Sequence, residues 1–134
     1  MKIFKIVFIA LCTVAVLFAC SKKDNPPTPN IVGYWTGLYG TVSQPTPYLD
    51  YAVLFRSNGT VRVFDDLDTS NSFRSEGTYT VSGNTVKTTY AYVGMPDDTY
   101  STSATLNANL TTMTGTWGRY SSTSGLGAFN LTKQ

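Results

Sequence analysis

Residues 77–93 read GTYTVSGNTVKTTYAYV, and this stretch decides the fold class. Val, Thr and Tyr recur with a period of two on both sides of Ser82-Gly83-Asn84, which is typical of β-strands. Gly83 and Asn84 tolerate the positive φ that a tight hairpin turn requires. The stretch therefore predicts two antiparallel strands joined by a short turn.

The same pattern continues on both sides of this hairpin. From residue 31 onward no segment has the 3.6-residue apolar period of a helix, and Ser57-Asn58-Gly59 supplies a second tight turn. The sequence therefore predicts an all-β domain. We expect eight strands, at about residues 33–42, 48–57, 60–65, 73–82, 85–93, 99–107, 111–119 and 126–132, with longer loops at about 65–72, 94–98 and 120–125.

Alternation places the large apolar side chains on one face of these strands. That face holds Tyr51, Val53, Phe55, Val61, Val63, Phe73, Tyr79, Val81, Val86, Tyr90, Tyr92, Tyr100, Ala104, Leu106, Met113, Trp117, Phe129 and Leu131. The opposite face carries Arg62, Arg74, Glu76, Lys87 and many threonines. A meander with one apolar face covers it most simply by closing on itself, which also removes exposed edges. We therefore expect a single closed or nearly closed antiparallel barrel of eight strands.

The first twenty residues have a different composition. Lys2 and Lys5 flank the start of an apolar run of about 15 residues, shorter than the roughly 20 that span a membrane. A basic start, a short apolar core and a small residue before a cysteine are typical of an export signal. Residues 17–20, LFAC, resemble the bacterial lipobox. This resemblance implies cleavage before Cys20 and attachment of acyl chains such as palmitate to it.

The next segment, SKKDNPPTPN, contains three prolines that favour an extended spacer. We therefore divide the chain into a signal peptide at 1–19, a lipidated cysteine and tether at 20–30, and a barrel domain at 31–134. In the sorting systems that the lipobox implies, a serine such as Ser21 directs a lipoprotein to the outer membrane. The basic pair that follows favours the periplasmic face over the cell surface, where some lipoproteins carry an acidic run.

Composition excludes several classes of site. Without the signal peptide the chain has eight basic and eight acidic residues, so its formal net charge is zero. Charge therefore gives no reason to expect nucleic acid as a partner. The chain has no histidine, Cys12 leaves with the signal, and Cys20 carries the lipid. The usual zinc, copper, haem and thiol-nucleophile sites are thereby excluded. We expect no metal and no cofactor.

A Gly-x-Trp segment at residues 33–35 opens the first strand, and Arg119 lies near the end of the seventh. This pair resembles the lipocalin pattern, which implies that Trp35 closes the barrel floor and that Arg119 packs over it. The segments IVGYWTGLYG, LFRSNGTVRVF, GTYTVSGNTV, ATLNANLTTMTGTW and GAFNLTKQ are similar to the lipocalin-like domains of small bacterial lipoproteins. An avidin-like barrel is the alternative, since it has eight strands and a signature similar to Gly-Thr-Trp at 115–117.

Six inward aromatic side chains are the candidate ligand contacts: Tyr51, Tyr79, Tyr90, Tyr92, Tyr100 and Trp117. Each joins an apolar ring to a polar tip, and such tips buried together can orient a ligand. Buried phenols without partners would cost a few kcal/mol each, which favours an interior that holds water or a ligand. The alternative is that these rings plug the barrel with their hydroxyls at its mouths.

The carboxylates do not form a recognisable catalytic or metal site. Asp65, Asp66 and Asp68 lack the calcium-loop spacing and are interpreted as solvated loop charges, as are Asp97 and Asp98. Glu76 is predicted to face outward, and Asp50 to lie opposite the inward Tyr51. A glycosidase needs two carboxylates facing each other at about 5 to 10 Å. We therefore expect no enzyme.

Two functions remain open. The first is a lipid-anchored binding module for a small, partly apolar ligand or a glycan. The second is an accessory or inhibitory protein that contacts another envelope protein through its loops. The barrel interior distinguishes them. A cavity of at least a few hundred Å³ lined by these tyrosines favours the first function. A filled interior with an exposed apolar patch on the loops favours the second.

Overall fold

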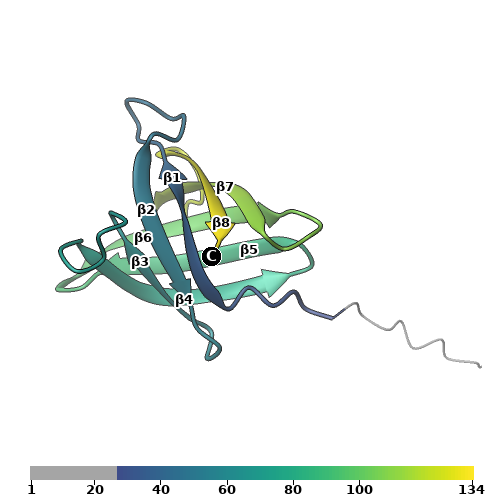
Figure 1. The fold of residues 1–134 in the computed structure, drawn as a ribbon. Coiled ribbons are helices and arrows are strands. Elements are labelled where there is room, and N and C mark those ends of the chain that lie inside the picture. The colour runs from purple at the N-terminus through teal and green to yellow at the C-terminus, as the bar shows by residue number, and fades with distance from the viewer. Residues whose placement is uncertain (1–26) are drawn as a thin grey trace, which may run out of the picture.

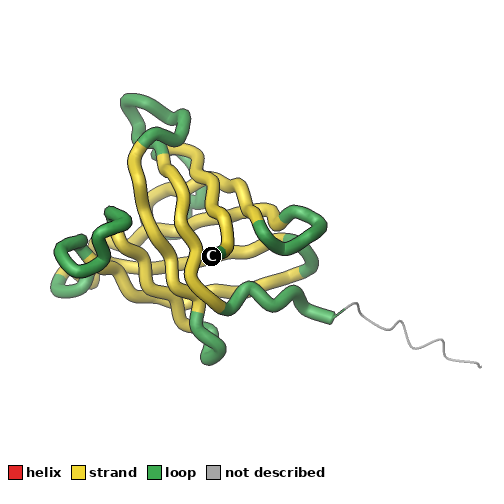
Figure 2. Tube along the Cα trace, viewed as in Figure 1, coloured by secondary structure: helices red, strands yellow, loops and turns green. Residues whose placement is uncertain are grey.

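The computed structural model describes residues 27–134, which form a closed barrel of eight antiparallel strands with meander topology (Figure 1). The strands are β1 (Gly33–Tyr39), β2 (Leu49–Phe55), β3 (Thr60–Phe64), β4 (Arg74–Ser82), β5 (Thr85–Tyr92), β6 (Met95–Leu106), β7 (Thr112–Arg119) and β8 (Gly127–Lys133). This part of the chain consists of strands and loops (Figure 2). The predicted all-β barrel is therefore confirmed.

The predicted signal peptide, the lipidation site Cys20 and most of the tether lie outside the described residues. Within residues 27–134 no helix is long and apolar enough to cross a membrane.

The turn residues explain why the hairpins form where they do. Gly59 and Gly83 have φ values of 81° and 55°, which an L side chain adopts only with strain. The asparagine beside the first of them, Asn58, accepts hydrogen bonds from the backbone N–H and the hydroxyl of Thr60 at 3.1 and 2.7 Å. Both tight turns predicted from the sequence are thus present.

The sixth strand begins earlier than expected, at Met95 rather than near residue 99. Pro96, Asp97 and Asp98 suggest a loop by composition, but the structure places them in a register shift of the β5–β6 pairing. Ala91 pairs with Thr99, whereas the next residue of β5, Tyr92, pairs with Met95. A proline donates no ladder hydrogen bond and is tolerated at such an irregularity.

The barrel closes where β1 pairs with β8, from Trp35 opposite Lys133 to Tyr39 opposite Phe129. Gly37 lies in the middle of this seam. A Cβ atom at Gly37 would lie 1.9 Å from the carbonyl oxygen of Asn130, far inside van der Waals contact. The two backbones therefore approach closely only because this residue has no side chain.

We distinguish the two ends of the barrel by their connections. The β1–β2, β3–β4, β5–β6 and β7–β8 loops form the mouth end, and the β2–β3, β4–β5 and β6–β7 turns form the floor end. Figure 1 shows the β1–β2 loop and the β2–β3 turn on opposite sides of the molecule. The described chain enters β1 at the floor end.

Trp35 fills the floor end and is 0% exposed. Its indole N–H donates a hydrogen bond of 2.9 Å to the carbonyl of Ile31, and its ring meets the edge of Phe55 with centroids 6.2 Å apart. The segment before β1 is thereby fixed across the floor. A tryptophan needs such a partner for its N–H when buried.

The predicted contact between Trp35 and Arg119 is wrong. Arg119 lies at the mouth end, where its guanidinium carbon is 5.8 Å from the Tyr100 ring centroid and its Nη2 is 3.3 Å from Asp98. The cation over Trp35 is instead Lys133, whose Nζ is 5.9 Å from the ring centroid. Trp35 lies near the start of β1, at the floor end, whereas Arg119 is the last residue of β7, at the mouth end.

The expected inward position of Phe73 is also wrong, because its side chain is 73% exposed. Phe73 precedes the first residue of β4 and lies beyond the rim of the barrel. It packs edge-on against Tyr92, with centroids 6.4 Å apart. Ser75, the next residue along the chain expected to face the same side, is buried.

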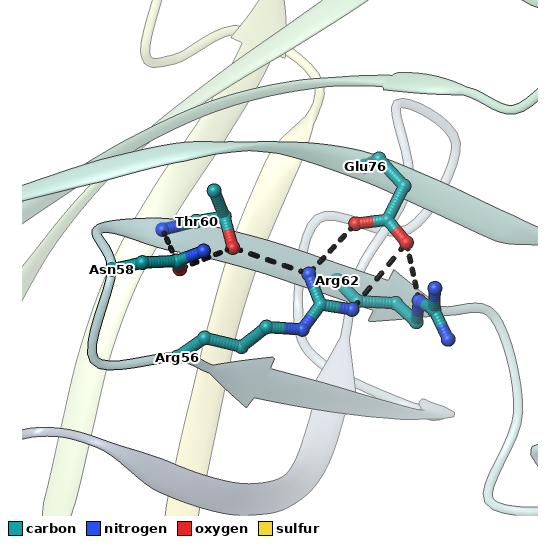
Figure 3. Close-up of polar contacts among 5 residues, drawn as sticks. All are labelled: Arg56, Asn58, Thr60, Arg62 and Glu76. Carbon is teal, nitrogen blue, oxygen red and sulfur yellow. Dashed lines mark hydrogen bonds and ion pairs between the residues drawn. The ribbon is translucent and has the colours of Figure 1, made fainter.

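The outer wall carries an ion-pair network centred on Glu76 (Figure 3). Its carboxylate accepts hydrogen bonds from Arg56 at 2.9 Å and from Arg62 at 2.5 Å. These bonds, with the one from Arg56 foremost, hold the pKa of Glu76 below its ordinary value. Glu76 faces outward as predicted, and its partially exposed pairs contribute little to stability.

We predict that Trp35→Ala lowers the free energy of unfolding by about 3–5 kcal/mol, because it leaves a large cavity at the floor and removes the hydrogen bond to Ile31. Urea unfolding followed by circular dichroism measures this loss. The control is Tyr34→Ala, one residue away on the outer face, for which we expect a smaller effect. A Trp35→Ala midpoint equal to that of the wild type would contradict the role of the tryptophan as a floor plug.

Candidate ligand-binding site

The barrel interior holds a cavity of about 200 Å³. Seven of the eight strands contribute to its wall, and β4 does not. A cavity of about 150 Å³ is large enough for benzene. The space therefore fits a molecule with one ring, or a compact aliphatic group, and a short polar extension.

The deep part of the cavity is apolar. Its wall there consists of Val53, Phe55, Val63, Val86, Ala104, Met113 and Leu131. The hydroxyls of Thr88 and Thr102 also line it, but they bond to each other at 2.7 Å and so satisfy one another across β5 and β6. The carbon atoms of a ligand would be stabilised at this depth by the hydrophobic effect.

Aromatic rings form the outer part of the cavity. Tyr39 meets Tyr51 and Trp117 edge-on, with centroids 5.5 and 6.0 Å away, and Tyr90 stacks on Tyr100 at 6.0 Å. The indole N–H of Trp117 donates a 2.9 Å hydrogen bond to the carbonyl of Gly40. This bond orients Trp117 and leaves its ring face for packing.

Three phenols in this wall, those of Tyr39, Tyr51 and Tyr90, have no hydrogen-bond partner within residues 27–134. Burial is the main cause of the raised pKa values of Tyr51 and Tyr90. Both hydroxyls therefore stay protonated at neutral pH. Each can donate one hydrogen bond and accept others, which a ligand or water in the cavity would satisfy.

Asp65 is the carboxylate that lines the cavity, and it is half buried. The hydroxyl of Tyr92 donates to its Oδ2 at 2.5 Å. Burial raises the pKa of Asp65, and the hydrogen bond from Tyr92 opposes this shift. The charge of Asp65 in turn contributes to the raised pKa values of Tyr39, Tyr90 and Tyr92, after burial as the main cause.

The structure brings together five of the six aromatic residues predicted from the sequence: Tyr51, Tyr90, Tyr92, Tyr100 and Trp117. Tyr79 is not among the lining residues. Its ring packs edge-on against Phe55 at 5.0 Å, and its hydroxyl donates to the carbonyl of Arg56 at 2.8 Å. The structure therefore does not bring Tyr79 together with the other five aromatic residues, since it lies at the floor end beside Phe55.

Five lining residues are absent from the sequence prediction: Tyr39, Thr41, Asp65, Thr88 and Thr102. Alternation could have found each of them. Tyr39 follows Trp35 and Gly37 with a period of two, and Asp65 follows Val61 and Val63 in the same way. The interpretation of Asp65 as a solvated loop charge is therefore wrong. Asp66 and Asp68 are exposed in the loop, as expected.

The described residues offer limited chemistry for metal binding. Within residues 27–134 no group of three or more His, Cys, Asp or Glu side chains could hold a metal ion. Asp65 stands among phenols and threonine hydroxyls, without a second carboxylate in the cavity wall of this part of the chain. The arrangement is suited to holding a molecule by packing, hydrogen bonds and one charge.

We predict that Asp65→Asn raises the melting temperature at pH 7, because it removes a poorly solvated charge and keeps an acceptor for Tyr92. Since the folded pKa of Asp65 is raised, the native state binds more protons than the unfolded state between its ordinary and raised pKa, and stability falls as pH rises through this window. The gain should therefore disappear below the ordinary aspartate pKa. Calorimetry between pH 3 and pH 8 measures it.

The exposed Asp66→Asn variant is the control for this experiment, and its melting temperature should follow that of the wild type across the pH range. A lower melting temperature for Asp65→Asn at pH 7 would show that the carboxylate stabilises the empty barrel.

Comparison with known proteins does not assign this chain to a family: no family model, curated protein or solved structure matches it. A barrel architecture alone hosts many unrelated functions. The function must therefore be argued from the cavity.

Proposed function

We propose that this protein is a lipid-anchored envelope binding module for a small, partly apolar ligand. The single observation that carries the proposal is the cavity of about 200 Å³, with an apolar depth and an outer wall of phenols. A barrel that served only as a scaffold would be expected to fill this space, because an empty apolar volume forfeits packing energy.

The size and lining of the cavity limit the ligand. About 200 Å³ is below the roughly 300–1,000 Å³ of most small-molecule sites, so the ligand is very small or inserts only one part of itself. A single sugar unit stacked on the outer tyrosines fits this volume, but the apolar depth favours a hydrocarbon or aromatic group. The hydroxyls of Tyr51 and Tyr90 would then orient its polar end.

The proposed lipid anchor determines which way the cavity faces relative to the membrane. The described chain enters the barrel at the floor end, next to Trp35, whereas the cavity is lined by Tyr39, Asp65 and Trp117 from the mouth end. A lipid on Cys20 would therefore hold the floor end toward the membrane and leave the mouth facing away. The lipobox and Ser21 support an outer-membrane location, with the periplasmic face favoured by Lys22-Lys23.

We further propose that the domain is lipocalin-like. The meander of eight strands and the buried tryptophan at the start of β1 support this. The position of Arg119 at the mouth does not, because the lipocalin pattern implies an arginine over the tryptophan. The family proposal therefore rests on topology and on Trp35.

A second candidate function has one observation in its favour. Among residues 27–134, seven of the eight large exposed apolar side chains lie at the mouth end: Val42, Tyr48, Leu67, Phe73, Val93, Met95 and Tyr120. Such a rim could contact another envelope protein, as an accessory or inhibitory subunit would. The same rim also suits the entrance of an apolar ligand, and the cavity supports ligand binding over this alternative.

Native mass spectrometry of residues 21–134, purified from the natural host, tests the proposal. This segment contains every strand of the described barrel and its core. We expect the wild type to carry an additional small mass and Ala104→Leu, which fills the cavity wall, to lose it. Thr105→Leu, which alters the exposed neighbour, should retain the mass.

An unliganded mass for all three proteins, under conditions that preserve weak complexes, would contradict ligand binding. It would favour the accessory-subunit alternative.

A further inference from the structure

Charge is distributed unevenly over the barrel. Of the seven carboxylate side chains in residues 27–134, six lie at the mouth end, and Glu76 lies on the outer wall. Arg74 and Arg119 are the basic side chains at this end, among six in the described range. The six carboxylates at the mouth are Asp50, Asp65, Asp66, Asp68, Asp97 and Asp98. The entrance of the cavity is therefore electronegative, which attracts cations and repels anions.

Asp65 carries this charge into the cavity, and no cationic side chain of residues 27–134 pairs with it. Arg119 forms an ion pair with Asp98 at 3.3 Å, and its guanidinium lies over the ring of Tyr100. The hydrogen bond from Tyr92 reaches Oδ2 of Asp65, and Oδ1 accepts none from the described residues. Burial disfavours the charged form and raises the pKa of Asp65, and the hydrogen bond from Tyr92 opposes this shift.

The rings around Asp65 add a second attraction for a positive charge. Tyr39, Tyr90, Tyr92, Tyr100 and Trp117 all line the cavity. The face of an aromatic ring is electronegative and attracts an ammonium group placed within about 6 Å. Aromatic walls combined with one carboxylate are chemically suited to an organic cation.

We propose that the ligand of this cavity is a small organic ammonium ion, with its carbon atoms in the apolar depth and its nitrogen beside Asp65. This inference rests on the proposed function and specifies its ligand class. The N–H groups of the ammonium would donate to Oδ1 of Asp65 and to the unpartnered hydroxyls of Tyr51 or Tyr90. The nitrogen would thereby neutralise the buried charge, and its binding would lower the pKa of Asp65.

A matched pair of probes tests this assignment. 2-Phenylethylammonium and 2-phenylethanol have the same carbon skeleton and differ in charge at the end of the chain. Nuclear magnetic resonance titration of residues 21–134, followed at the tyrosine rings and the Trp117 indole, gives a Kd for each probe. At pH 7 and low salt we expect the ammonium ion to bind at least about tenfold more tightly than the alcohol.

The variants Asp65→Asn and Asp66→Asn assign the effect to one carboxylate. Asp65→Asn should weaken binding of 2-phenylethylammonium about tenfold and leave 2-phenylethanol unchanged, because only the ammonium uses the charge. Asp66→Asn removes an exposed carboxylate from the same loop and should change the Kd of the ammonium ion by less than about twofold.

Two results would overturn the ammonium assignment. Equal affinity of the wild type for both probes would leave the cavity a ligand site without preference for cations. No shift at the tyrosine rings with either probe would also reject the assignment, whereas the proposed function would fall only if native mass spectrometry showed no bound molecule. The comparison of the two probes uses the wild-type chain, so it stands even if Asp65→Asn unfolds.

Discussion

The pairing of β1 with β8 is the constraint on which the rest of the structure depends. Seven other strand pairs connect neighbours along the chain and would form in an open sheet as well. Only the seam from Trp35–Lys133 to Tyr39–Phe129 turns the apolar face into an interior. It brings Tyr39 against Trp117, and it is possible because Gly37 leaves room for the backbone of β8. Without this seam there is no cavity.

Closure alone does not explain why one end is filled and the other is hollow. At the floor end Trp35, Phe55 and Tyr79 pack edge to edge, and the chain before β1 crosses them. At the mouth end the rings stand around a space, held by contacts along the wall, and the buried phenols of Tyr51 and Tyr90 are left without partners in the described chain. This arrangement gives up packing energy for a cavity with an apolar depth and an outer wall of phenols, which is typical of binding sites.

The sequence predicts which face each side chain takes better than it predicts where that side chain lies along the barrel axis. The odd or even position of a residue along a strand decides whether its side chain faces inward or outward. This alternation correctly predicts that Tyr51, Tyr90 and Trp117 face inward. The height of a side chain along the barrel axis depends on strand tilt and register, and alternation carries no information about either. Phe73 and Tyr79 share one parity, yet the first lies beyond the rim and the second closes the floor. The separation of Trp35 from Arg119 follows instead from strand direction, because β1 starts at the floor end and β7 ends at the mouth end. Asp65 continues the inward alternation of β3, but the composition of the loop that it begins suggested a solvated charge. The prediction for Asp65 is wrong for this reason.

The crystal structure of residues 21–134 grown with 2-phenylethylammonium tests the central claim most directly. The account predicts the carbon skeleton among Val53, Val86 and Met113, and the nitrogen within hydrogen-bond distance of Asp65. A barrel whose Tyr51 and Tyr90 rings have collapsed into the space, or a cavity that contains only water at saturating ligand, would contradict it.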